Sequence, residues 1–400
     1  MRTRYMWVKL GAVAFLFSQI NACGSEKTNS SLHLVMDQTG LDAVVNAGIP
    51  VEQVDTIGVG EFQVIVPVDS QDDLSFIMHK DLNRCGGFFQ FEGESDIESA
   101  MIEKSLTSAT FTPSYSISNE ATVTSALRSV NPISLMQVVT KLSEFQNRYY
   151  KSEFGVASQE WLAEYWRELI KNRKDARVEL VQHKSWSQPS VVLTIEGSDL
   201  ADEQVILGGH GDSITMSLFG KAKAKAPGAD DNASGIAVLT EAIRVIVDNN
   251  YYPSRTLKFM SYAAEEVGLR GSKEIATQTR RDDIKVAGVI QFDMTNFVNG
   301  DVISVLEDYT DEGLTAFLGN IIEKYVKVPW IKDRCGYACS DHASWHAQKY
   351  PVAVPFETAV SKRNRKIHSK NDTIQNMDAT GTHASHFAKM AVAFAMEVGK

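Results

Sequence analysis

The sequence of 400 residues lacks several features that mark other classes of protein. It has no long run of basic residues, and its formal net charge is −10. A protein whose main partner is nucleic acid needs a basic face, so we exclude that class. No G-x-S-x-G motif and no glycine-rich phosphate loop occurs, which leaves serine hydrolase and nucleotide chemistry without support. Internal repeats and low-complexity tracts are also absent.

Long apolar runs are scarce as well. The run near the N-terminus, residues 10–17, is too short to span a membrane. A basic segment precedes it, and small and polar residues around Cys23 follow it, which is typical of a secretory signal. We therefore expect residues 1–23 to direct export and the protein to be secreted. Residues 20–23 also resemble a bacterial lipobox, in which Cys23 would carry a lipid anchor, although Asn21 fits that pattern poorly.

Only four cysteines are present. Cys335 and Cys339 stand four residues apart, and in an oxidising compartment a local disulfide between them is favoured. A metal site built from thiolates would need more cysteines or a C-x-x-C pair. Such a short loop would fix local geometry more than it adds global stability. Cys85 stands alone, and its redox state is left open.

The N-terminal part reads as a separate unit, residues 24–112. Strand-like runs occupy residues 56–66 and 88–91, and a stretch rich in Ser, Thr and Pro at residues 105–116 is typical of a linker. No set of metal ligands is visible before the linker. Two interpretations remain open for this unit. It is an accessory domain, or it is a removable propeptide with the linker as its processing site.

The remainder, residues 113–400, alternates between helical and strand-like patterns. Helical periodicity begins at Pro132, with an apolar face that continues to Tyr149, and recurs at residues 158–172, 236–246, 314–325 and 383–398. Apolar runs at residues 191–195, 205–208, 257–263, 286–292, 302–306 and 352–355 predict strands. This alternation predicts an α/β fold, a three-layer sandwich whose mostly parallel or mixed central sheet is flanked by helices.

Polar residues cluster at the predicted carboxyl ends of these strands. His210, the pair Glu265–Glu266 and Asp293 each lie at or just past such an end, and Asp231 lies on a loop that leads into a helix. Binding sites in open α/β sheets form at this edge. Imidazole and carboxylate ligands without thiolate suit Zn²⁺, and suit Mn²⁺ or Co²⁺ less well.

A hydrolytic site with two metals would need residues of these types. Metals about 3.5–4 Å apart need one bridging carboxylate, and a second carboxylate must take a proton from the attacking water. Glu265 and Glu266 can divide the roles of base and ligand. Asp212 can accept a hydrogen bond from the far nitrogen of the His210 imidazole. Each residue also has an ordinary structural role open to it, and these patterns alone do not choose between Asp230 and Asp231.

Six motifs resemble one family. They are Gly-Gly-His-x-Asp-Ser (208–213), Ala-Pro-Gly-Ala-Asp-Asp-x-Ala-Ser-Gly (226–235), Tyr-Ala-Ala-Glu-Glu-Val-Gly-Leu-Arg-Gly-Ser (262–272), Gln-Phe-Asp-Met-Thr-Asn (291–296), the cysteine-bounded segment 335–346 and Ile-His-x-x-x-Asp-Thr (367–373). Together they resemble the secreted bacterial leucyl aminopeptidases. These are di-zinc exopeptidases, related to glutamate carboxypeptidases, glutaminyl cyclases and transferrin-receptor-like domains. The likeness runs from about residue 121 to the C-terminus. Residues 83–87 resemble the propeptide of those enzymes.

The resemblance implies a set of roles at two zinc ions per chain. Glu265 would be the general base for the attacking water, and Tyr337 would donate to the developing oxyanion. The substrate would be the free N-terminus of a peptide or protein, with its α-amine near the second metal. The implied metal ligands are Asp231 as the bridge, His210 and Asp293 in one site, and Glu266 and His368 in the other.

The resemblance also implies an apolar pocket for the first side chain of the substrate. Val360 stands where the related enzymes carry an aromatic residue, which should widen the pocket, and Glu307 lies close to it in sequence. We therefore hypothesise a tolerance for larger or basic first residues as well as leucine. The residues that match the family's pocket are Met294, Leu306, Phe356 and Ile367.

These observations predict an exported zinc aminopeptidase, made as a zymogen-like precursor that a processing protease shortens. We expect a monomer and no nucleic-acid partner. One alternative is a glutaminyl cyclase, which uses this fold with one metal. Another is a non-catalytic binding domain of the transferrin-receptor type, which would have lost ligands. The complete ligand set and Glu265 count against both alternatives.

Overall fold

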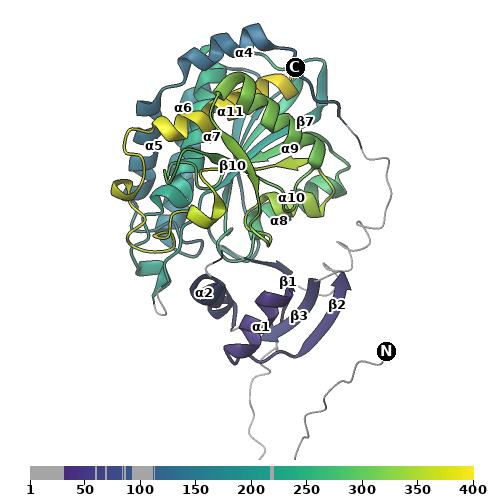
Figure 1. The fold of residues 1–400 in the computed structure, drawn as a ribbon, viewed down its shortest axis with the longest axis vertical. Coiled ribbons are helices and arrows are strands. Elements are labelled where there is room, and N and C mark those ends of the chain that lie inside the picture. The colour runs from purple at the N-terminus through teal and green to yellow at the C-terminus, as the bar shows by residue number, and fades with distance from the viewer. Residues whose placement is uncertain are drawn as a thin grey trace, which may run out of the picture.

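The computed structural model describes residues 31–58, 61–67, 70–82, 84, 87–91, 111, 113–216 and 220–400. The predicted signal segment 1–23, the lipid site at Cys23, Cys85 and most of the predicted linker 105–116 lie outside the described residues. Within the described part, none of the helices combines the length and the apolar character that crossing a membrane requires. Figure 1 shows a small N-terminal domain against one end of a much larger domain.

A mixed sheet of six strands forms the centre of the large domain, in the order β12-β9-β7-β8-β6-β5. The neighbours β12, β9, β7 and β8 run parallel, whereas β6 is antiparallel to β8 and β5 is antiparallel to β6. The predicted mixed α/β sheet is therefore confirmed, with β5 as a strand that the sequence did not indicate. The strands are β5 (Ala176–Val181), β6 (Ser190–Ile195), β7 (Leu200–His210), β8 (Arg255–Tyr262), β9 (Lys285–Gln291) and β12 (Val352–Ala353).

Helices cover both faces of this sheet. On β7, Val205 and Leu207 belong to the core that α6, α7, α9 and α11 build, whereas Ile206 belongs to the core under α8 and α10. Successive strand residues point to opposite faces, so this split produces the expected three layers. The helices are α4 (Glu120–Ala126), α5 (Pro132–Glu144), α6 (Glu153–Ile170), α7 (Gly235–Asp248), α8 (Arg270–Arg281), α9 (Glu312–Ile321), α10 (His342–Ala347) and α11 (Thr382–Val398).

Capping residues decide where two of these helices start. The Asn131 side chain accepts a hydrogen bond from the backbone N–H of Ile133, and Pro132 is pre-set for the first turn, so α5 begins as predicted. This helix ends at Glu144, and the predicted extension of its apolar face to Tyr149 is wrong, because the chain turns extended at Phe145. α6 starts five residues before the predicted position, after the Ser152 cap.

A second, three-stranded sheet combines β10 (Ile303–Leu306), β11 (Trp330–Asp333) and β13 (Pro355–Phe356). The predicted strand at residues 352–355 is divided between two sheets, since β12 pairs with β9 whereas β13 pairs with β10. The predicted helix 314–325 is α9 followed by a π-helical turn, η5 (Ile322–Val326). This small sheet stands beside the carboxyl edge of the main one and carries part of the site described below.

The N-terminal domain is an antiparallel sheet of order β2-β3-β1-β4, and its described residues also form the helices α1 and α2. The single strand predicted over residues 56–66 is wrong, because glycines at positions 58 and 60 interrupt the apolar run and the chain forms a hairpin, β2 with β3. The domain has its own apolar core, centred on Leu34, Val64 and Leu74. Its elements are β1 (Ser31–Asp37), α1 (Gln38–Asn46), β2 (Gln53–Gly58), β3 (Glu61–Pro67), α2 (Gln71–Leu82) and β4 (Phe88–Phe91).

The large core depends on α11. Phe394 is fully buried in it, so Phe394→Ala should leave a cavity and lower the free energy of unfolding by about 3–5 kcal/mol. Ile133→Ala is the control, because Ile133 is 68% exposed and its loss should change stability by less than about 0.5 kcal/mol. Guanidinium unfolding followed by circular dichroism measures both. Equal effects of the two variants would contradict this account of the core.

Candidate metal centre and substrate pocket

The parallel strands bring the predicted site residues to one edge of the sheet. β7 lies between β8 and β9, and its last residue is His210. The chain reaches Glu265 shortly after β8 and Asp293 shortly after β9. All of these side chains are buried. The strand-end placement that the sequence predicted therefore puts imidazole and carboxylate groups together, as the geometry of a parallel sheet requires.

Two clusters of ligand atoms share Asp231. In the first, His210 Nε2 lies 3.0 Å from Asp231 Oδ1 and 3.4 Å from Asp293 Oδ1. In the second, His368 Nε2 lies 2.9 Å from Asp231 Oδ2 and 3.2 Å from Glu266 Oε2. The two oxygens of one carboxylate thus face two different clusters, which is the geometry of a bridging ligand.

The residues of these clusters fit zinc. His210 Nε2, Asp293 Oδ1, Glu266 Oε1 and both Glu265 carboxylate oxygens are buried and make no hydrogen bond within the described part of the chain. Buried carboxylates without donors are costly unless a cation compensates them. His210 Nε2 approaches the carboxylates at ligand spacing, not with the geometry of a hydrogen bond. An all-imidazole-and-carboxylate set suits Zn²⁺.

The electrostatic environment differs between the carboxylates. Burial alone would raise the pKa of Asp231, but the close contacts with the His210 and His368 imidazoles outweigh it and hold the pKa well below its usual range. For Glu265, burial raises the pKa well above the usual range; Asp341 and Glu266 add to the rise, and His210 opposes it. The surrounding protein groups therefore favour the ionised form of Asp231 and the protonated form of Glu265.

Asp372 fixes the turn that carries Asp231. Its two carboxylate oxygens accept the backbone N–H groups of Asp230 at 3.1 Å and of Asp231 at 3.0 Å. The Asp230 carboxylate is itself held by the Asn296 backbone N–H at 3.3 Å and the Asn364 amide at 3.0 Å. Both Asp230 oxygens are therefore occupied away from the clusters. The geometry favours Asp231 over Asp230 as the ligand, a choice that the residue pattern alone left open.

Asp212 contacts the His210 imidazole, as expected, and also holds the loop after β8. Its carboxylate accepts the backbone N–H groups of Glu265 at 3.0 Å and Glu266 at 3.2 Å. The His210 imidazole Nδ1 donates to the backbone carbonyl of Asp212 at 3.2 Å, with the carboxylate 3.5 Å away. The expected contact between the Asp212 carboxylate and the imidazole is therefore present at 3.5 Å, beside the shorter hydrogen bond to the backbone carbonyl. Asp212 positions the loop after β8, and with it both glutamates.

Arg148 is a positioning residue that the sequence did not reveal. Its fully buried guanidinium donates to the backbone carbonyls of Gly211 at 2.9 Å, Pro227 at 2.5 Å and Gly228 at 2.9 Å. These carbonyls belong to the segment after His210 and to the turn before Asp231. Arg148 therefore ties together the two segments whose spacing defines the first cluster. No spacing rule links an arginine after α5 to these loops, so no sequence signal was available.

A pocket opens beside Asp293. Its wall contains the side chains of Met294, Leu306, Val354, Phe356 and Val360. Cys335 and Cys339 also line it, and they form the disulfide that the sequence predicted. Ile367 packs in the same apolar cluster, and Tyr337 lines the wall between the two cysteines. The structure thus brings together all the residues predicted for the first side chain of a substrate. Val354, which connects the two sheets, is a further member that no motif indicated.

Glu307 does not line this pocket. Its carboxylate is paired with Lys332 at 2.9 Å and Arg334 at 3.3 Å. The charged side chain that lines the pocket wall from the large domain, apart from Asp293, is Arg363.

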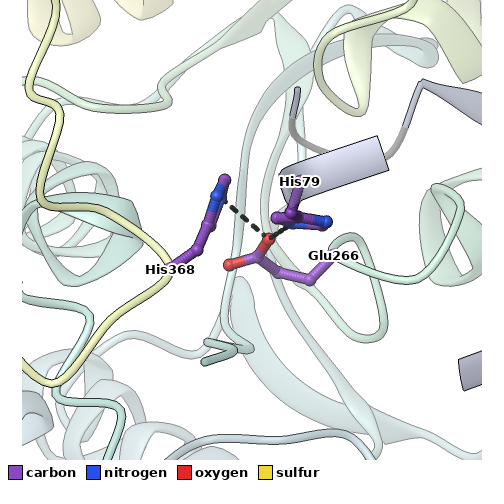
Figure 2. A group of neighbouring side chains, drawn as sticks. All are labelled: His79, Glu266 and His368. Carbon is purple, nitrogen blue, oxygen red and sulfur yellow. Dashed lines mark hydrogen bonds and ion pairs between the residues drawn. The ribbon is translucent and has the colours of Figure 1, made fainter. Parts of the chain in front are cut away.

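The N-terminal domain also places a side chain beside this centre, from a part of the chain in which the sequence shows no set of metal ligands. His79, on α2, places Nε2 3.0 Å from Glu266 Oε2. With Glu266 and His368 it forms a group whose ligand atoms all lie within 4.8 Å of one another, as Figure 2 shows. The sequence could not reveal His79, because a single histidine in a helix has no ligand spacing. Leu82 and Arg84 of the same domain line the substrate pocket.

Comparison with known proteins agrees with the geometry. The model of peptidase family M28 matches residues 190–394. A probable aminopeptidase of Saccharomyces cerevisiae is 31% identical over 89% of this chain and 96% of its own length. Probable leucine aminopeptidase 1 of Trichophyton verrucosum is 35% identical over 71% of this chain and 79% of its own length.

Solved structures extend the likeness to nearly the whole chain. The LapA aminopeptidase of Legionella pneumophila, 29% identical, superposes with a TM-score of 0.80 over 93% of this chain and 99% of that chain. LapB of the same organism, 27% identical, superposes with a TM-score of 0.79 over 92% of this chain and 99% of that chain. A glutaminyl cyclase of Fimbriiglobus ruber, 13% identical, superposes with a TM-score of 0.56 over 68% of this chain and 96% of that chain. At this identity the likeness shows a shared fold alone.

The role of Asp372 can be tested directly. Asp372→Ala leaves two buried N–H groups without an acceptor, so it should lower the free energy of unfolding by about 1–3 kcal/mol per donor and reduce the bound zinc. Asp301→Ala removes an exposed carboxylate and serves as the control. Thermal unfolding and elemental analysis of dialysed protein measure the two effects. Unchanged zinc content in Asp372→Ala would show that this residue does not position Asp231.

Proposed function

The chain belongs to peptidase family M28, and on that basis we propose that it is an exported di-zinc aminopeptidase that prefers large apolar first residues. The family and its relatives support a metallo-aminopeptidase hydrolase that acts on peptides. One observation carries the finer proposal. The two oxygens of Asp231 face two separate ligand clusters, and Glu265 stands beside them with both carboxylate oxygens free of protein hydrogen bonds.

The chain's residues divide between holding the metals and moving the proton. We assign His210 and Asp293 to one zinc ion, Glu266 and His368 to the other, and Asp231 to both. When bound, the zinc ions would polarise the scissile carbonyl and lower the pKa of the attacking water.

Glu265 is the proposed general base. Burial raises the pKa of Glu265, which makes its ionised carboxylate a stronger base. It would take a proton from the attacking water and deliver it to the departing amine. Tyr337 is the proposed donor to the oxyanion that develops on the carbonyl oxygen. The local disulfide on either side of Tyr337 supports this assignment, because it restrains the segment that presents the phenol.

The pocket supports a preference for apolar side chains. Its wall is built from Met294, Leu306, Phe356 and Val360. A basic first residue has little support, since Glu307 is already paired with two cations and Arg363 lines the wall. We therefore propose leucine, methionine and phenylalanine as preferred first residues, with the wide position at Val360 accommodating the larger ones.

Export and processing complete the proposal. The composition of residues 1–23 supports a secretory signal, with a lipid anchor at Cys23 as the alternative. We propose that residues 24–112 form a propeptide that a processing protease removes, leaving residues 113–400 as a monomeric enzyme. The contacts of the N-terminal domain with the metal cluster and the pocket support this role.

A glutaminyl cyclase is the alternative that shares the fold. It would use one metal, whereas the second cluster around Glu266 and His368 favours two. A binding domain without catalysis would not need the complete ligand set together with a buried base. Zinc content and the release of amino acids from peptides with free N-termini, compared with acetylated ones, discriminate among these functions.

The role of Glu265 predicts a separation of metal binding from turnover. Glu265→Gln in the processed enzyme should retain its zinc but lower kcat by about 10²–10⁴-fold, because the proton acceptor is lost. Glu164→Gln, at an exposed position on α6, should match the unaltered enzyme. Hydrolysis of leucyl peptides and elemental analysis measure the two properties. A Glu265→Gln enzyme with normal turnover would refute the mechanism.

Pocket width should depend on Val360. Val360→Phe narrows the pocket, so the phenylalanine side chain of a substrate should lose about 1–3 kcal/mol of contacts with the wall. We therefore expect kcat/KM for phenylalanine 4-nitroanilide to fall about tenfold relative to that for leucine 4-nitroanilide. Val298→Phe is the control, since Val298 is 50% exposed and does not line the pocket. An unchanged ratio of the two kcat/KM values would show that Val360 does not set specificity.

A further inference from the structure

Helix α2 of the N-terminal domain places His79 in the candidate metal centre. Figure 2 shows the imidazoles of His79 and His368 on either side of the Glu266 carboxylate. The same oxygen, Glu266 Oε2, lies 3.0 Å from His79 Nε2 and 3.2 Å from His368 Nε2. The two rings are 4.0 Å apart between centroids and nearly perpendicular, at 76°. Two nitrogens and one oxygen therefore converge from three separate parts of the chain.

These separations match a shared zinc ion. Zinc bonds of about 2.0–2.2 Å at tetrahedral angles place neighbouring ligand atoms about 3.3–3.6 Å apart. The 3.0 Å and 3.2 Å separations around Glu266 Oε2 are within a few tenths of an ångström of that range. His79 is itself buried, so its nitrogen has no access to bulk water as an alternative partner.

The tautomer of His79 also suits a ligand. Its Nδ1 is hydrogen-bonded to the backbone carbonyl of Ser75, and a carbonyl can only accept. The ring proton of the neutral imidazole is therefore at Nδ1, which leaves a lone pair on Nε2. The lone pair faces Glu266 Oε2, and two lone pairs at this distance repel each other. A cation bound by both atoms removes that repulsion. A backbone carbonyl on the far nitrogen is the usual support of a metal-binding histidine.

A packed interface holds α2 in this position. One turn before His79, the Ser75 hydroxyl donates to the backbone carbonyl of Glu266 at 2.8 Å. The ring of Phe88 lies so close to Gly268 that a Cβ there would come within 2.7 Å of it. Phe89 packs in one cluster with Leu269 of the large domain. The contact of His79 is thus part of a docked surface, in keeping with the position of α2 in Figure 1.

The same surface covers the substrate pocket. Leu82 and Arg84 line the pocket from the N-terminal side. The Arg84 guanidinium stacks 4.6 Å from the ring centroid of Tyr337, and Asp37 holds it with two hydrogen bonds of 2.9 Å and 3.0 Å. The N-terminal domain therefore contacts the proposed oxyanion donor and forms part of the wall of the pocket for the first side chain.

We infer that His79 is a ligand of the metal held by Glu266 and His368 in the full-length chain, and that this bond keeps the precursor inactive. The inference rests on the proposed function, since the coordination position that His79 fills is the one that the substrate's α-amine needs. Removal of the N-terminal domain withdraws the imidazole and exposes the pocket in one step. The domain thereby inhibits the enzyme through the metal as well as by covering the pocket.

Zinc K-edge absorption of the intact, zinc-loaded full-length protein tests the coordination. His79→Ala removes the imidazole, and His79→Gln replaces it with an amide of similar size in case the smaller side chain impairs folding, which circular dichroism checks. Lys80→Ala, an exposed neighbour on α2, is the control. Both His79 variants should lose about one third of the imidazole scattering per zinc, because the histidines at the metals fall from three to two. Lys80→Ala should lose none.

Turnover of leucine 4-nitroanilide by the same intact proteins gives the second readout. Loss of one metal bond worth at least about 1.4 kcal/mol should raise the activity of the His79 variants about tenfold or more above that of Lys80→Ala. Unchanged zinc scattering in the folded His79 variants would overturn the inference, whatever their activity. Reduced scattering without turnover in any form, processed enzyme included, would uphold His79 as a ligand and instead reject the aminopeptidase function.

Discussion

Buried negative charge at one edge of the sheet is the constraint on which the rest of the structure depends. A carboxylate in the low-dielectric interior must be protonated, hydrogen-bonded or paired with a cation. Backbone N–H groups satisfy Asp212 and Asp372, and side-chain and backbone amides satisfy Asp230. Asp293 and Glu266 keep oxygens with no such donor. The proposed metals would therefore stabilise these loops as well as supply the chemistry, so zinc binding and stability should be coupled.

The same constraint supports the proposed inactivity of the full-length chain. A hydrolytic metal site must leave a coordination position open for substrate, and an open position accepts any well-placed imidazole. α2 supplies one through His79, held by Ser75 against the backbone of Glu266. Latency then needs no change in the fold of the large domain. In this proposal it needs only that the N-terminal domain stays docked, and the release of that domain would restore both the metal position and the pocket.

Sequence patterns predicted the parts of the site that local rules control. Strand ends placed His210 and Asp293 at one edge, because parallel strands align their carboxyl ends, and the family motifs selected Asp231. The hairpin in residues 53–67 was missed, because the glycines at positions 58 and 60 fall inside a stretch whose pattern otherwise indicates one strand. Arg148 and His79 were missed for a different reason. Each acts across a contact between segments distant in sequence, and neither carries a spacing signature that a pattern could detect.

Anomalous diffraction at the zinc edge from crystals of the intact full-length protein tests the central claim most directly. The account predicts two peaks, one among His210, Asp231 and Asp293 and one among Asp231, Glu266 and His368. It also predicts His79 Nε2 at about 2.0–2.1 Å from the second peak. A single peak would contradict the two-metal centre. A second peak with His79 displaced from it would contradict inhibition through the metal.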